Sequence, residues 1–297
     1  MKKLMLQSVA VAAVAFSLTI TSCGNGTDTD TPVDTNDVDT GMVTTVIKDD
    51  IRVPSPGDIF EFMKLLGPET GDGNLLNPTD NEKKYTSTKS KAINLGVYSA
   101  DLLYASTFDV KDKVLSYFGT SMRMGTALNV ATGLSEKDKE RISKNAGNAD
   151  SLIAVGNDLY LSTFSNLESN QRGPELSLML AGGWIEAMYL SCNMVKDFEK
   201  DKSVANMIAQ QDVSLNNVIE YMTQHESNED VASVLQQMKD LKVLFDAVST
   251  TAGEAPKQVD GKRMKVGGGP QKNISKEQFD AIRKKIEEIR KGFVELT

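Results

Sequence analysis

Helical periodicity runs through almost the whole chain after residue 55, and it constrains the fold more than any other feature. In residues 276–296 the apolar side chains are spaced three and four apart, at Phe279, Ile282, Ile286, Ile289, Phe293 and Leu296. Such spacing places them on one face of an α-helix. Alternation typical of strands is nearly absent. The sequence therefore predicts a single all-α domain over residues 51–297.

Helix caps and breakers divide this domain into nine expected helices. Their bounds are 56–66, 90–107, 111–132, 136–146, 148–167, 174–198, 202–224, 228–250 and 276–296. The predicted caps pair Ser55 with Asp58, Ser227 with Asp230, and Ser275 with Gln278. We expect the C-terminal helix to dock on the body, with an oligomer seam as the alternative.

One small β-hairpin is expected near residues 258–266, around the turn Asp260-Gly261. The flanking residues 253–274 are predicted to form a flexible, basic, glycine-rich loop. The helices are expected to form an antiparallel stack of helical hairpins, either tetratricopeptide-like or an irregular bundle.

Residues 96–103 align with residues 183–190, and both segments place an alanine four positions after a glycine. Either an internal duplication or coincidence explains this match. Small residues at that spacing let two helix backbones approach closely. The pattern is similar to that of tetratricopeptide-like hairpins, although their repeat period of about 34 residues is absent.

The first 23 residues have the features of a targeting signal. Lys2 and Lys3 precede an apolar stretch that ends in Ile20-Thr21-Ser22-Cys23. This ending resembles the lipobox of bacterial lipoproteins, where signal peptidase II cuts before a cysteine that carries a diacylglycerol. The resemblance implies that residues 1–22 are a signal peptide and that Cys23 is lipidated, which anchors the protein to a membrane. An ordinary cleaved signal or an uncleaved anchor is the alternative.

Residues 23–50 are rich in aspartate and threonine and show no apolar periodicity, so they are predicted to form a disordered acidic tether. Gly24 follows the cysteine, and in bacterial lipoproteins this favours the outer membrane. We expect a periplasmic or surface-exposed position. At the level of class, the chain resembles all-helical lipoproteins of the cell envelope.

The charge and residue counts exclude several functions. A net charge of −8 and a pI near 4.9 argue against a nucleic-acid partner. One histidine and two cysteines leave little with which to bind a metal, and no cofactor is expected beyond the acyl lipid on Cys23. With Cys23 lipidated, Cys192 stands alone and is predicted to be a buried, inert thiol.

Two groups of residues are candidates for binding. Basic residues gather in the glycine-rich loop, where they either attract an anionic partner or are ordinary surface charges: Lys257, Lys262, Arg263, Lys265 and Lys272. Four aromatic residues either line a pocket or belong to the core: Tyr98, Tyr104, Trp184 and Tyr189.

No catalytic motif is recognisable, so the sequence favours a protein that is not an enzyme. His225, the one histidine, stands at a helix end and is expected to complement the helix dipole. Asp101 and Glu186 are the only candidates for paired carboxylates. The sequence therefore predicts a lipid-anchored envelope module that binds a protein partner. A small-ligand carrier with an apolar cavity between helices is the alternative, and a carboxylate-dependent hydrolase is a remote one.

Overall fold

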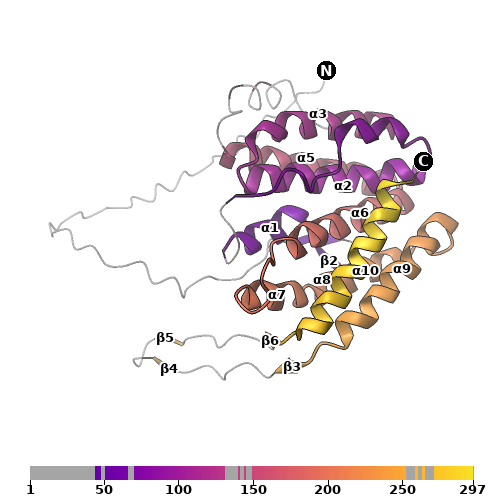
Figure 1. Cartoon of the computed structure of the whole chain (residues 1–297). Helices are drawn as coiled ribbons and strands as arrows, with labels where there is room; N and C mark the ends of the chain where they lie inside the picture. Colours follow the sequence, from indigo (N-terminus) through magenta and orange to yellow (C-terminus); the bar gives the residue numbers. More distant parts are fainter. Residues whose placement is uncertain are drawn as a thin grey trace, which may run out of the picture. The chain divides into compact units, whose positions relative to one another are not determined.

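Two helices, α2 (Thr88–Thr107) and α6 (Gly173–Cys192), form the centre of the fold (Figure 1). The computed structural model describes residues 44–47, 51–65, 70–130, 140, 144, 149–251, 258–259, 263–264 and 271–296. These residues belong to one compact unit, Met42–Thr297. Nearly every side chain of α2 and α6 is buried, as expected of helices surrounded on all sides.

The backbones of α2 and α6 come into direct contact where both helices carry glycine. A Cβ added to Gly96 would lie 2.0 Å from the Met179 carbonyl oxygen and 2.6 Å from the Gly183 nitrogen. A Cβ added to Gly182 would lie 2.1 Å from the carbonyl oxygen of Ile93. Only glycine leaves room for such an approach. The close approach that the small-residue pattern predicted is confirmed.

Seven further α-helices surround this pair in the part of the chain that the structure describes. Those that pack against α2 are α1 (Pro56–Lys64), α3 (Lys111–Ala127) and α5 (Ala149–Ser169). Helices α1 and α5 also pack against α6, as do α7 (Lys202–Ala209), α8 (Asp212–Thr223), α9 (Glu229–Asp246) and α10 (Lys276–Val294). A short 3₁₀ helix, η1 (Thr79–Lys84), precedes α2. The predicted all-α class is confirmed, in the form of an irregular bundle.

The strands are short and peripheral. β1 (Thr44–Ile47) pairs with β2 (Ile51–Pro54), so a strand lies within the last residues of the predicted tether. β3 (Thr250–Thr251) pairs with β6 (Gln271–Lys272). β4 (Gln258–Val259) pairs with β5 (Arg263–Met264), which confirms the small hairpin. No described helix is long and apolar enough to cross a membrane.

Several predicted helix ends need correction. The single helix expected over 202–224 is two helices, α7 and α8, that meet at Gln210 and Gln211. The helix expected to reach residue 198 ends at Cys192. The cap of α9 is Asn228, whose side chain accepts two backbone N–H groups, and not Ser227. The helix expected over 136–146 lies outside the described residues, apart from Glu140 and Lys144.

Helix α10 docks on the body as predicted. Its apolar face is buried against α6 and α9, through Phe279, Ile282, Ile286, Ile289 and Phe293. Its capping box, in which Ser275 and Gln278 bond to each other's backbone N–H, is also confirmed. The Ser55–Asp58 cap of α1 has the same reciprocal form.

Candidate functional site

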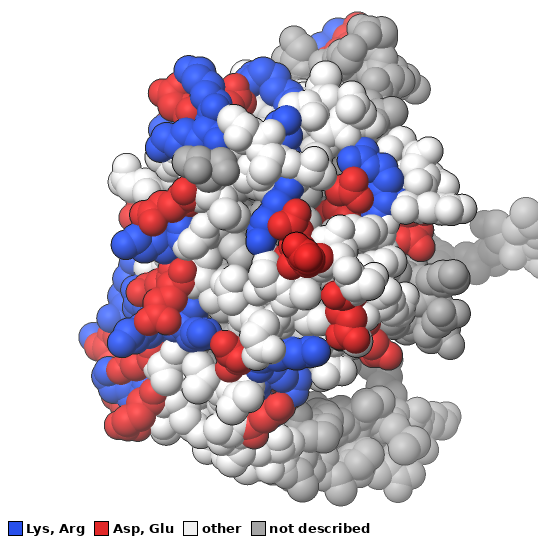
Figure 2. Space-filling view, turned by 90° about the vertical axis from the view of Figure 1, so that its right-hand side faces the viewer, with Lys and Arg blue, Asp and Glu red and all other residues white. Residues whose placement is uncertain are grey.

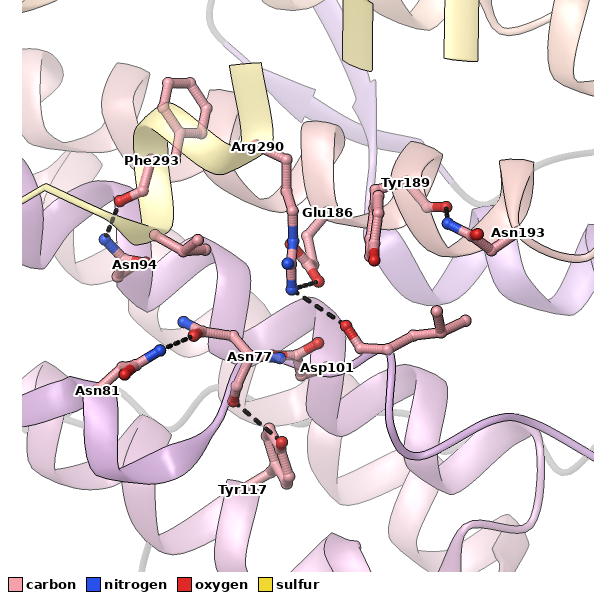
Figure 3. A network of polar contacts seen from close by, with 12 residues as sticks. Asn77, Asn81, Asn94, Asp101, Tyr117, Glu186, Tyr189, Asn193, Arg290 and Phe293 are labelled. Carbon is pink, nitrogen blue, oxygen red and sulfur yellow. Dashed lines mark hydrogen bonds and ion pairs between the residues drawn. The ribbon is translucent and has the colours of Figure 1, made fainter. Parts of the chain in front are cut away.

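The two carboxyl groups singled out by the sequence, Asp101 and Glu186, meet in the core (Figure 3). Asp101 lies on α2 and Glu186 on α6, the two helices that the glycines bring together. Both residues are 0% exposed, and the two carboxyl groups are close enough for the charge on Glu186 to act on Asp101. The pair is closed to solvent, so neither a water molecule nor a glycan reaches it in this conformation.

Arg290 of α10 supplies the positive charge of this cluster. Its Nε lies 2.9 Å from Glu186 Oε2 and its Nη2 lies 3.0 Å from Oε1, which makes a bidentate ion pair. The guanidinium also lies 4.2 Å from the centre of the Tyr189 ring. Burial opposes the charge on Arg290, but Glu186, Asp101 and Tyr189 together outweigh burial and raise the pKa of the guanidinium. The ion pair therefore persists in the core.

The surroundings of Asp101 favour its protonated form. Burial, and then the charge on Glu186, hold the pKa of Asp101 well above its usual value of 3.8. Its Oδ2 accepts the Asn77 N–H at 3.2 Å, while no donor among the described residues reaches Oδ1. A proton on Oδ1 makes that atom a donor itself and so accounts for the missing donor. Asp101, Glu186 and Arg290 together then hold no net charge.

Asp101→Asn is expected to flatten the pH profile of stability. Above about pH 4 the unfolded wild-type chain releases the Asp101 proton, while the folded chain retains it. The free energy of unfolding therefore falls as pH rises, by up to about 1.4 kcal/mol per pH unit, until the folded chain also releases the proton. An asparagine amide retains a donor toward Glu186 and has no proton to lose. Urea unfolding from pH 4 to 8 measures this slope.

Asp80→Asn is the matched control, because the Asp80 side chain is 91% exposed. This variant is expected to keep the wild-type slope. If Asp101→Asn kept it too, Asp101 would be ionised in the folded chain and the assignment of the proton would be wrong.

Asn77 connects this cluster to a surface loop. Its backbone N–H donates to Asp101, and its carbonyl accepts the hydroxyl of Tyr117 from α3 at 3.0 Å. Its side-chain amide donates to the Tyr85 hydroxyl at 3.0 Å and accepts from Asn81 at 2.8 Å. Asn77 is 0% exposed although it lies outside any helix or strand. Buried side chains thus satisfy its backbone and side-chain polar groups.

The residues on either side of Asn77 are held in the same way. The Leu75 carbonyl accepts from Arg290 Nη2 at 3.1 Å, and the Pro78 carbonyl accepts from the Tyr98 hydroxyl at 2.9 Å. Side chains from α2, α3 and α10 therefore fix residues 75–78, which we call the clamped loop. Irregular backbone this close to the core is stable only when its polar groups find such partners.

The outer side of the clamped loop lines a surface pocket of about 310 Å³. The lining combines loop residues with one face of α3: Gly73, Asn74, Leu76, Pro78, Thr79, Asp80, Lys113, Ser116 and Tyr117. Lys113 and Asp80 give it one cationic and one anionic side chain. Tyr117 belongs both to the pocket wall and to the network behind it. The pocket thus lies directly outside the buried polar cluster.

No protein-family model, no curated protein and no solved structure matches this chain. The clamped loop with its pocket is the candidate site.

None of the four predicted aromatic residues lines this pocket: Tyr98, Tyr104 and Trp184 belong to the core, and Tyr189 is partly buried against it. Trp184 donates to the Ser214 hydroxyl at 2.9 Å and packs edge-on against Phe245. Tyr104 accepts the Asp72 N–H through its hydroxyl. Tyr98 holds the clamped loop, and Tyr189 stacks on Arg290. Two of the four therefore support the candidate site from inside.

The predicted basic group is only partly within the described structure. Lys257, Lys262 and Lys265 lie outside the described residues, and Arg263 is described only as part of β5. Lys272 is mostly buried, and its ammonium lies 2.9 Å from Asp212 Oδ2. Its charge is thus neutralised within the fold, so the expectation that Lys272 binds an anionic partner has no support.

Neither Cys192 nor His225 forms part of the site. Cys192 is buried as predicted, and burial raises the pKa of its thiol to about 12, which disfavours the reactive thiolate. His225 packs against Tyr221, and burial lowers its pKa despite the nearby charge of Glu168. The lowered pKa favours the neutral imidazole, and the expectation that His225 complements the helix dipole stays a prediction.

Sequence reasoning missed Arg290, Asn77 and Tyr117. Arg290 had a usable signal, since it stands four residues after Ile286 and three before Phe293, at the edge of the buried face of α10. Asn77 and Tyr117 could not be singled out from the local sequence, because asparagine is common in loops and tyrosine is common in helices.

Proposed function

We propose that this protein is a lipid-anchored module of the bacterial envelope whose helical body binds a partner protein at the pocket beside the clamped loop. One observation carries the proposal. Buried side chains from three helices hold the polar groups of residues 75–78, and the outer side of the same residues is open to a ligand. A surface loop fixed in advance loses little conformational entropy on binding.

The surface charge supports a protein partner over a nucleic acid. On the face shown in Figure 2, lysine and arginine side chains lie among aspartate and glutamate side chains, with no broad patch of one sign. Binding to a phosphate backbone requires a concentrated basic surface. Close to the pocket, Leu115 of α3 is 51% exposed and offers a protein partner an apolar contact next to Ser116.

The anchor part of the proposal rests on the sequence. Cys23 and the acidic residues after it would hold the body at a distance from an outer membrane, in the periplasm or at the cell surface. The proposed role needs no catalytic group. The pocket volume also falls at the lower end for small-molecule sites, so a carrier of a small polar ligand is the second candidate.

Ser116→Trp is expected to abolish partner binding without unfolding the protein. Ser116 is an exposed residue of α3 that lines the pocket, so an indole there fills the pocket from the solvent side. Native mass spectrometry on the lipoprotein extracted gently from its own envelope measures the effect. Wild type is expected to carry a partner protein at a fixed stoichiometry, together with the acyl mass on Cys23. Ser116→Trp is expected to carry the acyl mass but no partner protein.

Ser203→Trp, at an exposed position of α7 away from the pocket, is the control and is expected to retain the partner. A bound small molecule in place of a protein would favour the carrier. A bare wild-type chain, or equal binding by Ser116→Trp and wild type, would refute the proposed site.

A further inference from the structure

We infer that Arg290 is a positioning residue through which the C-terminal helix α10 sets the shape of the pocket. This inference rests on the proposed function, since it concerns the regulation of the same site. The guanidinium binds Glu186 of α6 through two nitrogens, and its Nη2 also donates to the Leu75 carbonyl at 3.1 Å. One side chain thus joins α10, α6 and the first residue of the clamped loop (Figure 3).

The end of α10 holds the clamped loop at a second point. The Tyr85 hydroxyl accepts from the side chain of Asn77 and donates to the Val294 carbonyl at 3.1 Å, in the last residue of α10. Leu75 and Asn77 are therefore both tied to α10, one directly and one through Tyr85. Leu76 lies between them and lines the pocket.

Helix α10 can separate from the body more readily than either central helix. A single face of α10 is buried, whereas α2 and α6 are buried throughout. Its opposite face is rich in exposed charged residues and is free to be contacted. Displacement of α10 would withdraw Arg290 and Val294 together and release both ties on the loop.

Docking of α10 and occupation of the pocket are consequently coupled. A ligand that needs the loop in its clamped form favours docked α10, and a protein that pulls α10 away weakens binding in the pocket. By thermodynamic linkage the coupling acts equally in both directions. The clamped loop connects the two, because its position depends both on docked α10 and on the ligand in the pocket.

Amide hydrogen exchange of the full chain, read by mass spectrometry, tests the coupling without any ligand. Arg290→Lys keeps a positive charge for Glu186, but one ammonium cannot reproduce the planar fork that reaches Glu186 and Leu75 together. Exchange of residues 75–81 is expected to rise roughly tenfold or more, while α2 and α6 remain as protected as in wild type.

Arg283→Lys is the matched control, two turns earlier on the same helix. Arg283 donates to Asn193 and Glu287 and touches no part of the loop, so exchange of residues 75–81 is expected to stay at the wild-type rate. Tyr85→Phe is the second variant, because it breaks the tie between Asn77 and Val294 without altering a buried charge. It is also expected to speed exchange in the loop.

The inference is overturned if loop exchange is unchanged in Arg290→Lys and Tyr85→Phe, or if α2 and α6 lose protection to the same degree as the loop. A rise confined to the loop supports the coupling even when the extracted protein carries no partner. In that case only the proposed function is refuted, so failure of the proposed function can be distinguished from failure of the coupling.

Discussion

Arg290→Met is expected to lower the free energy of unfolding by about 3–5 kcal/mol, the cost typical of removing one partner of a buried ion pair. The variant leaves the Glu186 carboxylate, which is 0% exposed, beside Asp101 with its positive partner gone. It also removes the donor to the Leu75 carbonyl. Chemical denaturation at neutral pH measures the loss.

Arg283→Met is the control on the same helix. The Arg283 side chain is 34% exposed and pairs with an exposed glutamate, so its removal is expected to cost about 1 kcal/mol or less. Combining Arg290→Met with Glu186→Gln removes both charges and is expected to recover much of the loss. If Arg290→Met were as stable as Arg283→Met, the buried ion pair would not be present as described.

Gly96→Ala is expected to cost about 3 kcal/mol or more, because overpacking against backbone atoms cannot be relieved by a side-chain rotation. The new methyl carbon would lie 2.0 Å from the Met179 carbonyl oxygen and 2.6 Å from the Gly183 nitrogen. Helices α2 and α6 would have to separate, which would also pull Asp101 away from Glu186. Thermal and urea unfolding measure the cost.

Gly292→Ala provides the opposite case with the same chemical change. A Cβ at Gly292 meets no atom within 4 Å, and the residue lies within α10. Alanine there is expected to stabilise the protein by up to about 1 kcal/mol, the difference in helix propensity. Equal stability of Gly96→Ala and wild type would refute the direct backbone contact between α2 and α6.

The amphipathic helices and their caps could be predicted from the sequence because their signals are local. The spacing of apolar residues in α10 and the Ser275–Gln278 box both depend on residues within one or two turns. The division between α7 and α8 could not be predicted, since it occurs at Gln210 and Gln211, where neither glycine nor proline marks a break. Gln211 is buried at this break, which no local pattern of the sequence predicts.

Only part of the candidate site could be predicted from the sequence. Asp101 and Glu186 stood out as acidic residues in apolar helices, but their contact depends on how α2 and α6 cross, which is a tertiary property. Arg290 had only its place at the edge of the apolar face of α10 to mark it. Asn77 lay in a polar loop whose burial depends on tyrosines distant in sequence, among them Tyr117.

The amide exchange rate of Asn77 in the wild-type protein tests the central claim most directly, which is that the core network holds the pocket loop in place. The Asn77 N–H donates to the fully buried Asp101, so its exchange is expected to be as slow as that of amides within α2, although Asn77 lies in a loop. Exchange as fast as that of an exposed loop would contradict the clamped loop, and with it the binding site proposed on its outer side.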